Sequence, residues 1–167
     1  MLRKNPELKF ETGSGSFAIV ASRYNAHYVD SMLRAAKAEL WRAEVSRIQI
    51  VRVPGAYEIP VVAARLAKDS AGHTDHASRL SAIICLGVIL RGETVHAAHI
   101  GEAVSRALME IQLAHEIPVI HEVLLLDNEE QARERCLNPK INRGTEAAQA
   151  ALAMARVMKK LNSENAL

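Results

Sequence analysis

The chain has 167 residues, 49% of them hydrophobic and 24% charged, and a formal net charge of +2 at pH 7. This length fits one domain with a full core, and so small a charge without a long basic run argues against binding to nucleic acid or to a membrane surface. The first residues lack the apolar stretch of a secretory signal, and the longest apolar run, 80–90, is too short to cross a bilayer as a helix. Two isolated cysteines, Cys85 and Cys136, make neither a disulfide framework nor a zinc site. We therefore expect a cytoplasmic protein with a single globular domain.

The beginning of the chain differs from the rest in its pattern. Residues 1–15 show no periodicity, and we expect a loose extension or a segment that pairs with a neighbouring subunit. Residues 16–167 are expected to form the domain. Within it, four short runs rich in Val and Ile predict strands that are buried on both faces. These runs cover residues 16–21, 48–53, 81–90 and 118–126.

Longer stretches between these runs repeat apolar residues at helical spacing. They predict helices over residues 29–40, around 62–66, over 100–111 and from about 148 to 161. The alternation of strands and helices predicts an α/β fold, in which helices cover both faces of a four-stranded parallel sheet.

Polar residues predict where several of these elements begin and end. Thr94 is expected to open the helix that contains residues 100–111, and Asp127 with Glu130 three residues later resembles a capping box for a further short helix. The polar segment 69–78 is predicted to be an exposed loop.

The residues that follow each strand are the candidates for a site, because ligands bind beyond the carboxyl ends of the strands in an open parallel sheet. After the first strand, the ring of Tyr24 offers a flat face for a heterocycle, although a partly exposed core tyrosine is by itself the commoner case. Asn25 beside it is an ordinary turn residue. After the second strand, Pro54 and Gly55 fix a rigid turn that presents Glu58 together with backbone amides. This turn suits a polyol or an imide edge, and equally a purely structural role.

The segment after the third strand, RGETVH at 91–96, carries the most chemistry. Its glycine-containing turn enters a helix N-terminus, where free N–H groups and the helix dipole favour a bound phosphate. His96 is expected in the first turn of that helix, on its inward stripe near the sheet edge. Beside a phosphate-binding turn, an imidazole can transfer protons near neutral pH. After the fourth strand, Arg135 and Arg143 offer cations for the same phosphate.

Five segments resemble the lumazine synthase family in order and spacing. They are SRYN at 22–25, RVPGAYEIP at 52–60, GVILRGETVH at 87–96, EEQARER at 129–135 and NRGTEAA at 142–148. The second and third form a highly specific pair, and the likeness covers the chain from Phe17 to about Leu161. It implies a flavodoxin-like three-layer α/β/α sandwich and active sites between adjacent subunits of a homopentamer or a multiple of it. It also raises riboflavin synthase as a further partner.

The resemblance implies the reaction as well. The family joins 5-amino-6-(D-ribitylamino)uracil to 3,4-dihydroxy-2-butanone 4-phosphate, giving 6,7-dimethyl-8-ribityllumazine and phosphate, with no cofactor and no metal. Carried over by position, the uracil and its ribityl chain would be bound by Tyr24, Asn25, Ala56, Tyr57, Glu58, Leu90 and His121. The phosphate would be bound by Gly92, Glu93, Thr94 and Arg135, with Arg143 and Glu146 as further members of the site. His96 would transfer protons.

Several residues depart from the family's usual pattern. Ala97 and Ala98 follow the histidine in place of an aromatic and an acidic residue, His121 replaces a common phenylalanine, and Arg143 replaces a lysine. These departures leave a second hypothesis open, a binding or assembly protein that keeps the fold without catalysis.

A third hypothesis is a metal protein, since His96 and His99 lie three residues apart on one predicted helix. No carboxylate or cysteine stands at a spacing that completes a zinc site with them, so we expect no metal. The sequence does not determine whether pentamers stay single, pair into decamers or close into an icosahedral shell.

Overall fold

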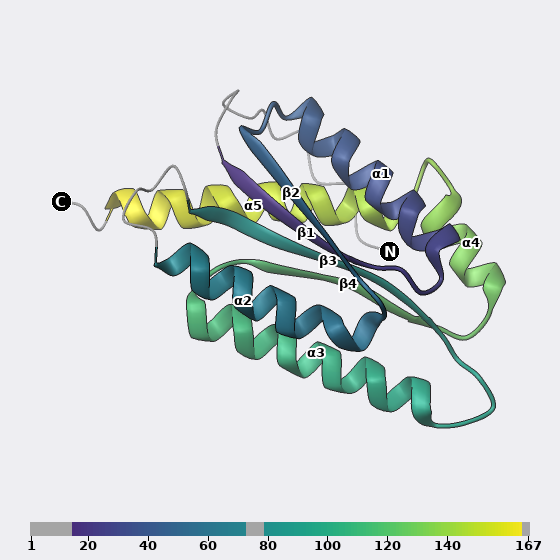
Figure 1. Ribbon diagram of the computed structural model, residues 1–167. Helices are drawn as coiled ribbons and strands as arrows, with labels where there is room; N and C mark the ends of the chain where they lie inside the picture. Colours follow the sequence, from purple (N-terminus) through teal and green to yellow (C-terminus); the bar gives the residue numbers. More distant parts are fainter. Residues whose placement is uncertain (1–14, 73–78, 165–167) are drawn as a thin grey trace.

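The computed structural model describes residues 15–72 and 79–164, so the expectation for residues 1–15 lies outside this part of the chain except at Gly15. Four strands, five α-helices and one short 3-10 helix follow one another along the described residues (Figure 1). In chain order they are β1 (Ser16–Ser22), α1 (Ala26–Arg42), β2 (Arg47–Val53), η1 (Ala56–Glu58), α2 (Ile59–Ala71), β3 (Leu80–Leu90), α3 (His96–His115), β4 (Val119–Leu126), α4 (Glu129–Leu137) and α5 (Arg143–Glu164).

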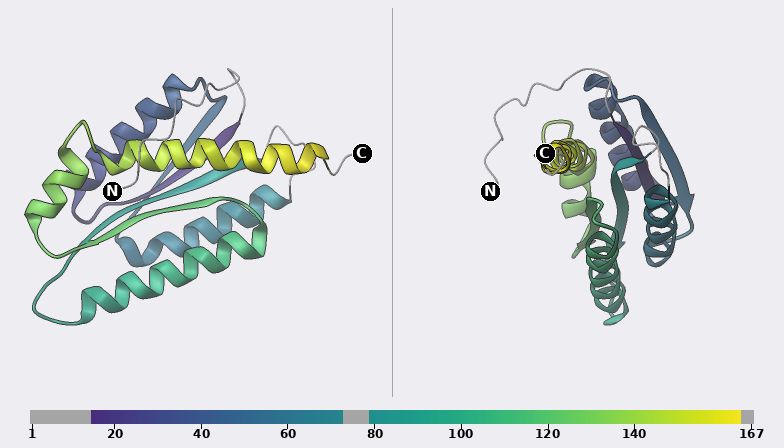
Figure 2. Two further views of the ribbon diagram at one scale, coloured as in Figure 1. Left: turned by 180° about the vertical axis from the view of Figure 1, so that it is seen from behind. Right: turned by 90° about the vertical axis from the view of Figure 1, so that its left-hand side faces the viewer.

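The four strands form one parallel sheet in the order β2-β1-β3-β4. Helices α1, α4 and α5 pack on one face of this sheet and α2 and α3 on the other, so the molecule has three layers (Figure 2). The strand order reverses direction between β1 and β3, which is the place where sheets of this class bind ligands. The expected flavodoxin-like α/β/α sandwich with a four-stranded parallel sheet is confirmed.

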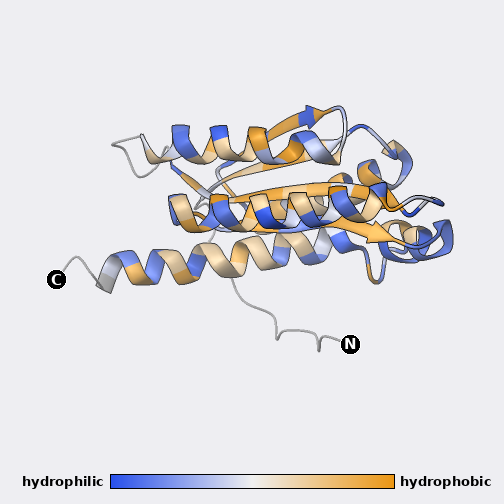
Figure 3. Ribbon diagram, turned by 90° about the horizontal axis from the view of Figure 1, so that it is seen from below, coloured by the Kyte–Doolittle hydropathy of each residue, from blue (hydrophilic) through white to orange (hydrophobic). Residues whose placement is uncertain are grey.

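The core follows from the alternation of side chains along the inner strands. Phe17 and Ile19 of β1 face α1 and α5, whereas Ala18 and Val20 face α2 and α3. All of β1 is buried, and β3 is buried from Ala82 onward except at its last residue, so both strands read as continuous apolar runs. Figure 3 shows the strands as mainly hydrophobic and the helices as two-sided. None of the helices described is both long and apolar enough to span a membrane.

The layer of α1 and α5 depends on a close approach of two backbones. A Cβ atom on Gly144, in the first turn of α5, would lie 2.0 Å from the carbonyl oxygen of Met32 in α1. Only a residue without a side chain allows this contact. The N-terminal end of α5 is therefore fixed against α1.

The prediction that residues 48–53 are buried on both faces is wrong. Within β2 only Val53 is buried, and Ile50 is 38% exposed. The reason is the place of β2 at the edge of the sheet, where its outer side has no neighbouring strand among the described residues.

Several predicted helix boundaries are also wrong, because a polar residue near the start of a helix does not by itself make the capping hydrogen bond. The third helix begins at His96 after Val95, so Thr94 does not cap it. Asn128, one residue after the predicted Asp127, caps α4 by accepting a hydrogen bond from the Gln131 N–H. Helix α2 continues into the predicted loop as far as Ala71, and α5 begins at residue 143 rather than near 148.

Candidate active site

Hydrogen bonds tie the carboxyl ends of the four strands into one rim, which lies at the right of Figure 1 with the 91–95 loop and α4. The Arg23 N–H donates to the Val53 carbonyl at 2.7 Å, which joins the ends of β1 and β2. The Arg91 N–H donates to the Leu126 carbonyl at 2.8 Å, which joins β3 and β4. The side-chain amide of Asn25 spans from β1 to the Val88 carbonyl of β3 at 2.8 Å. The segments expected to bind substrate thus start from one fixed edge.

Tyr24 and Asn25 have different local roles at the end of β1. Tyr24 is 72% exposed, so its ring is available for stacking. Asn25 has a left-handed backbone (φ 55°), a conformation that asparagine tolerates better than most residues. Since its amide nitrogen bonds to Val88, Asn25 holds the turn and places Tyr24 at the rim.

The turn after β2 presents one buried and two exposed residues. Ala56 is buried against the sheet, whereas Tyr57 is 64% exposed. The carboxylate of Glu58 accepts a hydrogen bond from the Gly55 N–H at 2.9 Å, so the side chain folds back onto its own turn. The turn therefore offers an aromatic ring beside an oriented carboxylate.

The segment between β3 and α3 is exposed from Arg91 through His96, and Leu90 before it is half-buried. An ion pair of 3.0 Å between Arg91 and Asp127 ties the loop to the end of β4. A Cβ atom on Gly92 would meet nothing within 4 Å, so packing alone does not require a glycine here. Glu93 and Thr94 lie in the same open loop.

His96 is the first residue of α3 and is exposed, so the prediction that it shares the inward stripe is wrong. One residue further, Ala97 takes the buried position, on the same stripe as Val104 and Leu108, and the helix begins one residue later than a Thr94 cap would have it. His96 makes no hydrogen bond or ion pair with other described residues. Its imidazole is therefore open to a ligand at the N-terminus of α3.

His121 lies in the middle of β4 rather than at the rim, on the face toward α3. Its Nε2 lies 2.8 Å from the hydroxyl of Ser105, which also donates to the Gly101 carbonyl at 2.7 Å. Because a hydroxyl has one proton, Nε2 must be the donor in its contact with Ser105 when both bonds form. The neutral ring then has Nδ1 as a free acceptor.

The two candidate arginines differ in their surroundings. Arg135, in the last turn of α4, is exposed and makes no ion pair within the described part of the chain. Arg143, at the start of α5, donates through Nε and Nη2 to the two carboxylate oxygens of Glu122, at 2.9 and 2.7 Å. A third bond runs from Nη1 to Glu146. Arg143 and Glu146 thus form one cluster with a residue that the sequence analysis missed.

Glu122 is a buried carboxylate in β4, 6% exposed, and it faces α5. Burial raises its pKa, while the hydrogen bond and charge of Arg143 act against that shift. For Arg143, burial acts to lower the pKa, but the paired carboxylates raise it. The signal that could have identified this residue is a single charge within the apolar run VIHEVLLL.

The predicted site residues fall into two groups. The strand-end group comprises Tyr24, Asn25, Ala56, Tyr57, Glu58, Leu90, Gly92, Glu93, Thr94 and His96. The β4–α5 group comprises the predicted His121, Arg135, Arg143 and Glu146 together with Glu122, which the sequence analysis did not predict, and His121 lies on the opposite face of β4 from Glu122. Across the described ranges, no hydrogen bond or ion pair joins one group to the other. Within the same ranges, no three His, Cys, Asp or Glu side chains form a cluster that could hold a metal ion.

Comparison with known proteins assigns most of the chain to one family. A family model described as 6,7-dimethyl-8-ribityllumazine synthase matches residues 14–159. A protein of that name from Stenotrophomonas maltophilia (strain R551-3) is 39% identical over 150 residues, which cover 89% of this chain and 92% of the relative. Another from Thermobifida fusca (strain YX) is 38% identical over 158 residues, which cover 93% of this chain and 87% of the relative. One from Clostridium kluyveri (strain ATCC 8527) is 37% identical over 147 residues, which cover 87% of this chain and 90% of the relative. The chain belongs to the 6,7-dimethyl-8-ribityllumazine synthase family of enzymes.

Proposed function

We propose that this member of the family condenses 5-amino-6-(D-ribitylamino)uracil with 3,4-dihydroxy-2-butanone 4-phosphate. The products are 6,7-dimethyl-8-ribityllumazine and inorganic phosphate, and the reaction is the condensation step of riboflavin biosynthesis. The observation that carries the proposal is the strand-end group, because its exposed side chains follow three adjacent strands of a family-matched fold. No cofactor or metal takes part.

The uracil and its ribityl chain bind at the ends of β1 and β2. The exposed ring of Tyr24 stacks on the heterocycle, and Asn25 keeps that ring at the rim. Tyr57 and the backbone of Ala56 line the turn after β2, where the Glu58 carboxylate can accept from ribityl hydroxyls. Leu90 and His121 supply further contacts to the ring system.

The phosphate binds at the loop before α3. Gly92 leaves open space there, so a phosphate can approach the amides of Glu93 and Thr94 closely. Arg135 supplies a guanidinium that makes no ion pair with the described residues and can bind phosphate through paired hydrogen bonds. Positive charge at this place also favours the departure of phosphate.

The chemistry requires repeated proton transfer. An amine attacks the ketone to give an imine with loss of water, phosphate is eliminated, and the second amine closes the ring with loss of another water. His96 is the group for these transfers, because an exposed imidazole at the phosphate site can both accept and donate protons. Holding the two substrates together supplies much of the remaining rate gain.

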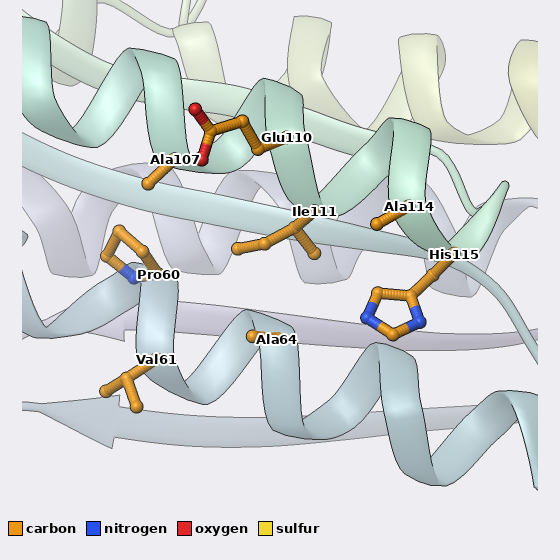
Figure 4. A pocket seen from close by; sticks show the side chains of 8 residues that line it. All are labelled: Pro60, Val61, Ala64, Ala107, Glu110, Ile111, Ala114 and His115. Carbon is orange, nitrogen blue, oxygen red and sulfur yellow. The ribbon is translucent and has the colours of Figure 1, made fainter.

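We further propose a homo-oligomer, a pentamer or a multiple of it, in which the strand-end group of one subunit meets the β4–α5 group of the next. In one chain the two groups make no polar contact within the described residues. A shallow apolar groove between α2 and α3 supports the assembly (Figure 4). It is lined by the apolar residues Pro60, Val61 and Ala64 of α2 and Ala107, Ile111 and Ala114 of α3, and Glu110 and His115 of α3 complete the lining. We also propose that the protein acts in the cytoplasm and that riboflavin synthase is a further partner.

Purified protein incubated with both substrates tests the reaction, since the lumazine product is fluorescent. Lack of product at any enzyme concentration would reject catalysis and favour the binding or assembly hypothesis.

A mixing experiment tests the shared site. The variant His96→Ala is defective in the strand-end group and Arg135→Met in the β4–α5 group. In a mixed oligomer, some sites combine the intact strand-end group of one variant with the intact β4–α5 group of the other. Mixed oligomers should therefore regain part of the activity at low concentrations of the phosphorylated substrate. Two separately assembled pools, combined without dissociation, are the control. If mixed oligomers are no more active than that control, each site lies within one chain.

A further inference from the structure

The Glu122–Arg143 pair is the most buried charged contact in the β4–α5 group. The Glu122 side chain is 9% exposed and the Arg143 side chain 26%. Both oxygens of the carboxylate receive a hydrogen bond from the same guanidinium. Such a two-pronged contact fixes the orientation of the guanidinium plane as well as its position.

The backbone on both sides of Arg143 is also held. Asn142 is buried, with its amide nitrogen bonded to the Cys136 carbonyl and its amide oxygen accepting from the Gly144 N–H at 2.9 Å. Gly144 lies against Met32 at a distance that allows no side chain. Neither end of the Arg143 side chain can therefore move without breaking buried contacts.

The charges of this cluster cancel. Arg135 and Arg143 carry two positive charges, and Glu122 and Glu146 carry two negative charges. Arg143 is surrounded by both carboxylates, whereas Arg135 makes no ion pair with the described residues. For Arg143 to bind an anion, Glu122 would have to remain behind as a buried carboxylate without its partner, which is strongly unfavourable.

We propose that Glu122 sets the phosphate affinity of this site by restraining Arg143. Arg143 is then a positioning residue that anchors α5 to β4, and Arg135 is the guanidinium that binds phosphate. The inference rests on the proposed function in one respect, namely that a phosphate-bearing substrate occupies the site. It names Glu122 as a determinant of how tightly that phosphate is bound.

Binding of inorganic phosphate, measured by calorimetry on the assembled protein, tests the inference without turnover. In Glu122→Gln, Arg143 loses its buried charged partner and keeps only the exposed Glu146, so it gains freedom to reach the anion and phosphate should bind about 3- to 10-fold more tightly than in the wild type. In Glu122→Gln/Arg143→Met the gain should disappear. Glu129→Gln is the matched control, because it removes the same charge from an exposed pair with Arg133 on α4 and should leave the affinity unchanged.

Three outcomes would overturn the inference. They are an unchanged or weaker affinity in Glu122→Gln, a gain that persists without Arg143, and an equal gain in Glu129→Gln. If Glu122→Gln does not fold, Glu122→Leu/Arg143→Met replaces the pair with apolar side chains and removes the buried charges together. That double variant should bind phosphate within about 2-fold of the wild type, and a tenfold loss would identify Arg143 as a phosphate ligand.

The same experiment separates this inference from the proposed function. If the wild type makes no lumazine but the phosphate affinities of the variants change as expected, the proposed reaction fails and the restraint on Arg143 stands. If lumazine is made, but the Glu122 substitution does not change the phosphate affinity or no variant binds phosphate, the restraint fails and the reaction stands.

Discussion

The strand-end group and the β4–α5 group both belong to the predicted active site, but their polar side chains are used in different ways. Tyr24, Tyr57 and His96 are exposed at the rim. Glu122, which is buried, and Arg143, which is half-buried, by contrast bind each other. An exposed group without a protein partner can meet a ligand at little cost in stability, whereas a buried ion pair is costly to break. Substitutions in the strand-end group should therefore lower the rate, and those around the pair should lower the stability.

The largest effect is expected at Gly144, which holds the N-terminal end of α5 against α1. Gly144→Ala would place a Cβ atom 2.0 Å from the Met32 carbonyl oxygen, so we expect the free energy of unfolding to fall by about 4 kcal/mol or more. Denaturant unfolding measures this. Gly101→Ala is the control, because its Cβ meets only Leu125 at 3.4 Å and alanine favours helix by about 1 kcal/mol. Equal losses in both variants would contradict the close approach.

Arg143→Met should destabilise the protein by about 3 kcal/mol at neutral pH, because it leaves Glu122 buried without its partner. The pKa of Glu122 is already raised by burial, so the carboxyl binds protons more readily in the folded than in the unfolded state. The destabilisation should therefore be small below the ordinary glutamate pKa and grow as pH rises through the raised pKa. Arg135 and Glu146, the other charges near Glu122, act in opposite directions. Unfolding at several pH values checks this, and a loss that does not change with pH would contradict it.

His96→Ala should lower turnover about 100-fold, the usual contribution of a general acid-base group, and leave the melting temperature unchanged because the side chain is exposed. Steady-state lumazine fluorescence measures the rate. His99→Ala, one turn further along α3, is the control and should keep nearly full activity. Similar losses in both variants would instead support the hypothesis of a shared metal ion.

Arg135→Met should raise the KM for the phosphorylated ketose roughly tenfold, while the KM for the uracil changes little. Arg133→Met is the matched control, because Arg133 lies on the same helix but is engaged with Glu129. If the affinity for the uracil alone changes, Arg135 is not the phosphate ligand.

The smallest effect concerns the cysteines, which are buried on opposite sides of the sheet. Burial raises the pKa of the Cys136 thiol to about 11 and that of Cys85 further still. Since the thiolate is the reactive form, neither should react with a disulfide reagent at pH 8 in the native protein. Both should react after denaturation, and reaction of the native protein within minutes would contradict this burial.

Much of the architecture could be predicted from local patterns in the sequence. The apolar runs of β1 and β3 and the helical spacing between them identify an α/β sheet with helices on both faces. The turn motifs place Tyr24, Glu58 and His96 next to strand ends, since that placement depends only on neighbouring residues. The same motifs carried the family resemblance, which the comparisons confirm.

Only the tertiary structure decided which of these residues are free. Glu122 and Arg143 are 21 positions apart, and their pairing follows from the register of β4 and the docking of α5 on α1. The exposure of β2 follows from its edge position, which is a property of strand order and not of the apolar run itself. Local patterns record which residues prefer strand or helix, but partners distant along the chain are set by packing. For that reason the sequence alone offered both arginines as phosphate ligands, whereas the folded chain separates the paired Arg143 from the exposed Arg135.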